Sequence, residues 1–78
     1  MNVVGETVTV LTSTDPTKAG VTGRVLLETL NMLVLDSAGR TVRVEKAGAA
    51  FMLVDSGELF TGSDVAGRLQ DRWGRRAA

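Results

Sequence analysis

Short runs in which hydrophobic and polar residues alternate fill most of residues 6–61, and this period of two is typical of half-buried β-strands. Val8 and Val10 alternate with threonines near the start, and Val42 and Val44 alternate with polar residues further on. Turn-forming residues separate the runs. The pattern predicts six strands, at about residues 6–13, 21–28, 32–35, 41–45, 51–54 and 59–61.

Residues 20–36 predict the central pair of strands. Alternation assigns one face of the first strand to Val21, Val25 and Leu27, and the other face to Thr22, Arg24 and Glu28. The alternation stops at residues 28–31, where Asn31 suits a tight turn because asparagine tolerates a left-handed backbone. The apolar run 32–35 needs cover on both faces, either from the barrel interior and a helix or from a second protein.

The remaining connections are predicted from their turn-forming residues. Asp15-Pro16 favours a loop between the first two strands. Asp36-Ser37-Ala38-Gly39 suits a hairpin made of a type I turn and a bulge, with the glycine at its end. Residues 46–50 read as a corner of small residues that contains Gly48.

The last part of the chain has a different period. Val65, Leu69 and Trp73 recur every four residues, which predicts a short C-terminal helix at about 64–76. Its start is open between a cap at residues 63–64 and a position near Arg68.

Several short strands followed by one helix indicate a mainly β fold, a small antiparallel barrel in which closure of the sheet removes exposed edges. At 78 residues the chain predicts one domain, 1–78, with the barrel at about 6–63 and the basic helix at about 64–76.

Composition narrows the possible chemistry. The sequence contains neither Cys nor His, which excludes disulfides, thiolate metal sites and the commonest general base. Nine acidic residues could in principle hold Mg²⁺, but Glu28, Asp36 and Glu45 fall in separate predicted elements, so we expect no catalytic or metal site in this chain. No apolar run approaches the roughly 20 residues of a membrane span, so we expect a soluble cytoplasmic protein.

Charge is distributed unevenly although the formal net charge is zero. Residues 1–67 contain five basic and eight acidic residues, a net of −3, whereas residues 68–78 contain four arginines and one aspartate, a net of +3. A stand-alone nucleic-acid binder is usually strongly basic, so the zero net charge alone argues against RNA binding, whereas the basic tail on a mildly acidic body is an asymmetry of charge that the sequence shows.

Three segments resemble the archaeal ribonuclease P protein component 1 family, counterpart of a eukaryotic ribonuclease P/MRP subunit. The family motif G-x-x-G-x-V-x-x-E-T-x-N-x-L is matched by Gly20, Gly23, Val25, Glu28, Thr29, Asn31 and Leu33. The motif K-x-G-A-x-F is matched by Lys46, Gly48, Ala49 and Phe51, and G-R-P-E-D-R is matched in part by Gly67, Arg68, Asp71 and Arg72. Glu45, Leu69 and Gln70 depart from the family pattern, in which prolines stand at two of these places.

The resemblance implies a six-stranded Sm-like barrel and a non-catalytic subunit of the ribonucleoprotein that removes the 5′ leader from precursor tRNA. In that family the RNA, with Mg²⁺, is the catalyst, and a second, zinc-binding protein subunit is the usual partner. The implied partners are therefore ribonuclease P RNA, that second subunit and, indirectly, precursor tRNA, with no cofactor bound by this chain and no membrane. The alternatives are an Sm-like homo-oligomeric RNA chaperone and a barrel adaptor that binds only proteins.

Candidate site residues follow from charge and position. Predicted RNA contacts are Arg24, Lys46, Arg68, Arg72, Arg75 and Arg76, because guanidinium and ammonium groups match phosphates. A surface ion pair explains Arg24 equally well. For Lys46 the odds that it contacts a phosphate are also about even. Predicted structural turn residues are Glu28, Thr29, Asn31 and Gly48, with Glu28 accepting backbone N–H bonds. The predicted partner interface consists of Leu26, Met32, Val34 and Trp73.

Overall fold

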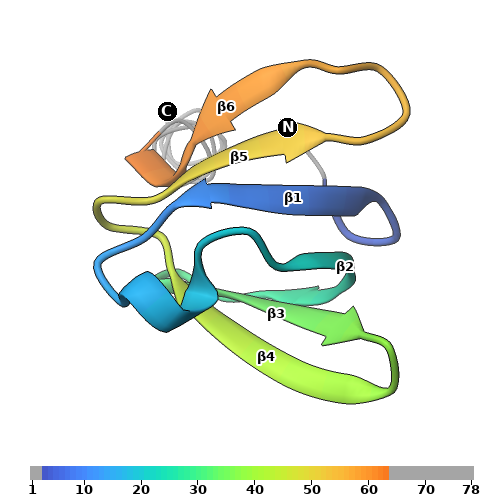
Figure 1. Cartoon of the computed structure of the whole chain (residues 1–78), viewed down its shortest axis with the longest axis horizontal. Helices are drawn as coiled ribbons and strands as arrows, with labels where there is room; N and C mark the ends of the chain where they lie inside the picture. Colours follow the sequence, from blue (N-terminus) through green and yellow to red (C-terminus); the bar gives the residue numbers. More distant parts are fainter. Residues whose placement is uncertain (1–2, 64–78) are drawn as a thin grey trace, which may run out of the picture.

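Six antiparallel strands form a single sheet in the computed structural model, which describes residues 3–63 (Figure 1). The elements in chain order are β1 (Thr7–Thr12), the 3₁₀ helix η1 (Pro16–Lys18), β2 (Thr22–Glu28), β3 (Met32–Ser37), β4 (Arg40–Glu45), β5 (Ala50–Leu53) and β6 (Leu59–Thr61). The mainly β, six-stranded antiparallel class predicted from the sequence is confirmed. The predicted helix at about 64–76 lies outside the described residues.

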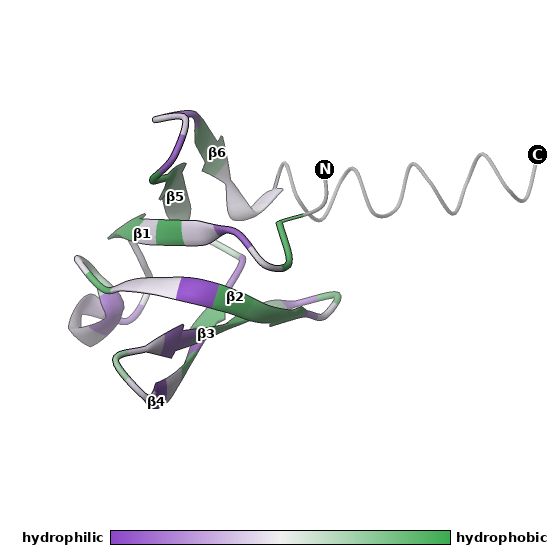
Figure 2. Ribbon diagram, turned by 90° about the vertical axis from the view of Figure 1, so that its right-hand side faces the viewer, coloured by the Kyte–Doolittle hydropathy of each residue, from purple (hydrophilic) through white to green (hydrophobic). Residues whose placement is uncertain are grey.

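The sheet has the strand order β4-β3-β2-β1-β5-β6, and it is strongly curved, with the edge strands β6 and β4 at the top and bottom of the view in Figure 2. Within residues 3–63 no hydrogen-bonded ladder joins β4 to β6. The segments that follow these two strands nevertheless touch, because a Cβ atom on Gly62 would overlap the backbone of Lys46. Because only glycine allows two backbones to come this close, Gly62 is what lets the barrel shut there.

The core fills the inside of the curled sheet with the inward-facing member of each alternation. Its buried members are Val3, Val8, Val10, Val25, Leu33, Leu35, Val44, Ala49, Phe51 and Phe60. The rings of Phe51 and Phe60 stack with their centroids 5.1 Å apart, which joins β5 to β6. Full burial of each large aliphatic or aromatic side chain stabilises the fold by about 1.5–3 kcal/mol, so alternation largely decides the fold.

A β-bulge in β2 reverses the facing of the residues that follow it. Val25 lies opposite Leu35, but Leu27 lies opposite Val34, so the extra residue Leu26 shifts the register. Leu27 therefore faces outward and is 54% exposed, whereas Glu28 faces inward opposite the buried Leu33. The predicted faces of Leu27 and Glu28 were wrong, because a bulge breaks the period of two on which they rested.

The β3–β4 hairpin also differs from its prediction. Ala38 and Gly39 both have positive φ, 51° and 83°, and Ser37 pairs with Arg40 on either side of them. This is the two-residue type I′ turn, whose twist matches that of the flanking strands, and not a type I turn with a bulge. The Asp36 carboxylate accepts a hydrogen bond from the Gly39 N–H at 3.1 Å, which holds the turn.

Candidate RNA-binding and partner-binding surfaces

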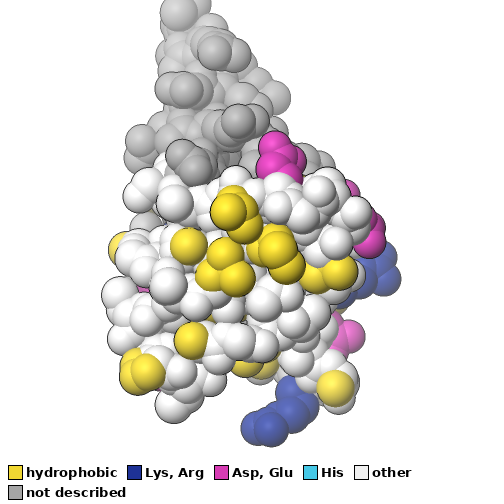
Figure 3. All heavy atoms as spheres, turned by 45° about the horizontal axis from the view of Figure 1, so that its top comes forward, with side chains coloured by type: hydrophobic (Ala, Val, Ile, Leu, Met, Phe, Trp, Pro, Cys, Tyr) yellow, Lys and Arg dark blue, Asp and Glu magenta, His cyan; other side chains and the backbone are white. Residues whose placement is uncertain are grey.

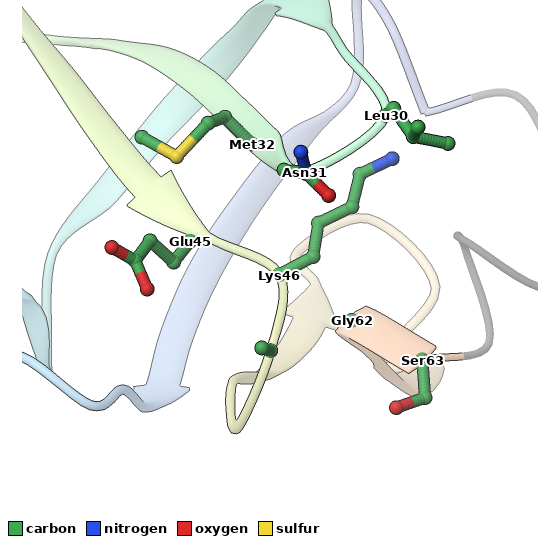
Figure 4. A pocket seen from close by; sticks show the side chains of 8 residues that line it. Leu30, Asn31, Met32, Glu45, Lys46, Gly62 and Ser63 are labelled. Atoms are coloured by element: carbon green, nitrogen blue, oxygen red, sulfur yellow. The ribbon is translucent and has the colours of Figure 1, made fainter.

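Lys46 lies inside the barrel mouth and not on its surface. Only 2% of the residue is exposed, and its Nζ lies 3.1 Å from the Glu28 Oε2. It continues the inward positions of Val42 and Val44, and its side chain runs past Asn31 towards the β2–β3 turn (Figure 4). Since its ammonium group is buried against a carboxylate, this geometry gives no support to the predicted phosphate contact. The sequence contains a signal for this burial, because the alternation of β4, extended past its last residue to position 46, places Lys46 on the inward face with Val42 and Val44.

A hollow of about 370 Å³ opens beside this ion pair, where the β2–β3 turn meets the ends of β4 and β6 (Figure 4). Its lining consists of Leu30, Asn31, Met32, Glu45, Lys46, Ala47, Gly62 and Ser63. Glu45 is its one carboxylate. Among residues 3–63, no three His, Cys, Asp or Glu side chains are grouped so that they could hold a metal ion.

The predicted turn residues have different functions in the structure. Thr29 holds the β2–β3 turn, because its N–H donates to the Met32 carbonyl at 2.9 Å and its hydroxyl accepts from the Met32 N–H at 3.0 Å. Glu28 binds Lys46. Asn31 does not have the positive φ for which asparagine was expected, and its carbonyl accepts the Lys46 N–H at 2.8 Å. Gly48 has φ 71° at the corner and therefore matches the prediction of a turn.

Arg24 lies exposed on the outer face of β2, opposite Thr7 on one side and Asp36 on the other. No ion pair links its guanidinium to another residue of the described range. An unpaired exposed guanidinium leaves its hydrogen-bond donors available to a phosphate or to a protein, so its function stays a prediction. Arg68, Arg72, Arg75, Arg76 and Trp73 lie outside the described residues, and their functions stay predictions too.

Apolar side chains gather on the outside of β2 and β3. Leu26, Leu27 and Leu30 are 49%, 54% and 44% exposed, and Met32 and Val34 are half-buried. We call these five residues the β2–β3 apolar patch. Neighbouring exposed apolar side chains make this patch the candidate surface for protein binding. Leu27 was missed as an interface candidate, because no feature of the sequence marks the bulge that turns it outward.

The distribution of charge over the surface is uneven. Figure 3 shows hydrophobic side chains gathered near the centre of one face, with Lys and Arg side chains at its lower and right-hand margins. The described part of the chain has no helix long and apolar enough to cross a membrane.

The fold is that of a small antiparallel β-barrel protein. The family model described as ribonuclease P/MRP, subunit p29, matches residues 1–75. The chain belongs to this family, so the resemblance in its three motifs is confirmed.

Two archaeal relatives are both named ribonuclease P protein component 1. The protein of Methanosarcina acetivorans is 39% identical over 57 residues, which are 72% of this chain and 52% of that protein. The chain therefore spans about half the length of that relative. The protein of Sulfurisphaera tokodaii is 27% identical over 75 residues, which are 94% of this chain and 97% of that protein.

Proposed function

We propose that this protein is a non-catalytic subunit of ribonuclease P that binds the catalytic RNA and assists removal of the 5′ leader from precursor tRNA. The observation that carries the proposal is the family match over residues 1–75. The names of the two archaeal relatives support it. The protein is then part of an endoribonuclease that acts in the cytoplasm, and its chain holds no cofactor, since the RNA binds the Mg²⁺.

The proposed contribution of the protein is electrostatic. Arg24 and the tail arginines Arg68, Arg72, Arg75 and Arg76 neutralise phosphates and so hold a folded RNA in its active shape. Lys46 is left out of this set, because its ammonium group is already paired with Glu28 inside the barrel. Neutralisation by protein replaces part of the neutralisation by cations, so the RNA becomes active at lower magnesium.

The β2–β3 apolar patch is the proposed docking surface for a second protein subunit, which the resemblance identifies as zinc-binding. Trp73 is the further candidate for this interface.

Leu27→Asp places a charge at the centre of the patch and should weaken binding of the second subunit at least tenfold, as measured by calorimetry. Leu59→Asp is the matched control, because Leu59 is 66% exposed on β6, away from the patch, and it should leave the affinity unchanged.

Reconstitution tests the proposed function. The full chain is mixed with an archaeal ribonuclease P RNA and the remaining protein subunits, and cleavage of precursor tRNA is followed as magnesium is lowered. The complete mixture should cleave at magnesium concentrations where the mixture without this chain fails. The chain without RNA should cleave nothing, and RNA-independent cleavage that survives further purification would overturn the proposal.

The two alternatives give different results in simpler measurements. A homo-oligomeric RNA chaperone has a solution mass several times that of the 8.2 kDa monomer. A protein-only adaptor shows no salt-dependent affinity for RNA. A monomer with salt-dependent RNA affinity therefore excludes both.

A further inference from the structure

A second hollow, of about 390 Å³, lies between η1 and the β3–β4 hairpin. Its lining consists of Thr17, Lys18, Val21, Ser37, Arg40, Thr41 and Val42. We call this hollow the basic cleft, because two cations and no carboxylate line it. The charge of its lining contrasts with that of the first hollow, where the buried lysine is neutralised.

The position of Lys18 is fixed by the open edge of β4. The Lys46 N–H donates to the Asn31 carbonyl, which shows which residues of β4 hydrogen-bond to β3. The residues between them turn their backbone N–H and C=O groups away from β3. Arg43 is one of these, and its carbonyl accepts a hydrogen bond from the Lys18 Nζ. The ammonium group of this half-buried residue is therefore held at one place and keeps further N–H donors for a ligand.

Asp15 and Asp36, the carboxylates nearest the cleft in sequence, accept hydrogen bonds from other groups, and beside the Thr17 hydrogen bonds the charge of Lys18 also helps to lower the pKa of Asp15. Asp15 accepts bonds from the Thr17 N–H at 3.0 Å and from the Thr17 hydroxyl at 2.7 Å, and Asp36 accepts from the Gly39 N–H. No ion pair within residues 3–63 includes Lys18 or Arg40. Lys18 and Arg40 are thus the charged groups of the cleft, and Ser37, on the same face of the hairpin as Arg40, adds a neutral hydroxyl.

We propose that the basic cleft binds a phosphate group of the RNA backbone, with Lys18 and Arg40 as its charged contacts. Donors that converge from separate elements on one hollow suit the oxygens of a phosphate, and arginine matches two of them at once. The inference rests on the proposed function, and it adds a contact on the barrel that the tail arginines do not provide.

The test measures the affinity of the full chain for an in-vitro-transcribed archaeal ribonuclease P RNA over a range of salt concentrations. Loss of one phosphate contact flattens the slope of log affinity against log salt by about 0.7–0.9. Arg40→Ala should show this loss and bind about tenfold more weakly at physiological salt, and Arg40→Lys should recover most of the slope. Thermal melts of each variant should match the wild type, since Arg40 is exposed.

Arg43→Ala is the matched control. It removes the same charge from the same strand, its side chain does not line the cleft, and its backbone carbonyl still accepts the bond from Lys18. Its slope should equal that of the wild type. Equal slopes for Arg40→Ala and the wild type would overturn the cleft as an RNA contact while leaving the proposed function intact. A wild-type protein that binds no RNA would overturn both.

A titration with inorganic phosphate distinguishes the two possible ligands of the cleft, a phosphate of the RNA backbone and free phosphate. In an NMR titration, the amides of Ser37 and Thr41 should shift only at millimolar phosphate, as expected for one group taken from a longer chain. Micromolar binding of inorganic phosphate, with an RNA slope that Arg40→Ala leaves unchanged, would make the cleft a site for free phosphate and overturn the proposal.

Discussion

The two ends of β4 each have a lysine beside them, in opposite surroundings. At the C-terminal end Lys46 is 2% exposed and pairs with Glu28 at 3.1 Å. Towards the other end Lys18 is half-buried in a cleft whose lining has no carboxylate. One cation therefore stabilises the fold and the other is available to a ligand. What decides between these functions is the group that each ammonium reaches, a buried carboxylate for Lys46 and a backbone carbonyl at the β4 edge for Lys18, and not the residue type.

The largest effect on stability is expected at the C-terminal end of β4, where Lys46 pairs with Glu28. Lys46→Met removes one partner of a buried ion pair and leaves the Glu28 carboxylate unpaired, which should lower the free energy of unfolding by about 3–5 kcal/mol. The double variant Glu28→Leu/Lys46→Met leaves no buried charge and should recover most of that loss. Chemical denaturation measures both. A double variant as unstable as Lys46→Met would show that the pair is not what the barrel depends on.

Gly62→Ala tests the contact that shuts the barrel at the same end. The new Cβ would overlap the Lys46 backbone, so one of the two segments that follow β4 and β6 must move. We expect a loss of about 1–3 kcal/mol in the free energy of unfolding, comparable to overpacking of a core. Ser63→Ala, at the exposed next residue, should change it by less than about 0.5 kcal/mol. Equal stabilities for the two variants would contradict the closed end.

At the other end of β4, a substitution in the hairpin turn beside the basic cleft should make the fold more stable. Ala38 has φ 51°, a left-handed conformation that asparagine adopts more readily than alanine. Ala38→Asn should therefore raise the free energy of unfolding by about 1 kcal/mol, measured by thermal melts. Ala47→Asn is the control, since Ala47 does not have a positive φ, and a gain of the same size there would contradict the reason given.

The smallest effect concerns acid stability near the cleft. The Thr17 hydroxyl and N–H hold the pKa of Asp15 below its ordinary value. A carboxyl whose pKa is lowered by folding contributes stability above its unfolded pKa, and this stability is lost as pH falls through the folded pKa. Asp15→Asn should remove this small part of the acid dependence in urea denaturation from neutral to acid pH. Thr17→Ser keeps both donors and should leave the acid dependence as in the wild type.

The sequence predicted the strands well, because alternation reports burial directly. The second of two valines in β1, Val10, and the first in β4, Val42, both face inward as their period requires. The sixth strand, only three residues long, was found from the turn before it. In each case the local pattern and the packing agree, so no long-range information was needed.

The site was harder to predict, because it depends on register. The bulge at Leu26 costs one residue of pairing, and it exchanges the faces of Leu27 and Glu28 without any mark in the sequence. The basic cleft depends on a contact between Lys18 and Arg43, which are 25 residues apart. Neither alternation nor turn chemistry carries information on contacts at that separation.

The affinity of Glu28→Leu/Lys46→Met for ribonuclease P RNA, measured as a function of salt, tests most directly whether the two lysines differ as described. The variant lacks Lys46 but keeps Lys18, Arg40 and the tail arginines. If Lys46 serves only the fold, the plot of log affinity against log salt will run parallel to that of the wild type. A slope flatter by about 0.7–0.9, the value of one lost phosphate contact, would show that Lys46 reaches the RNA and would contradict this account.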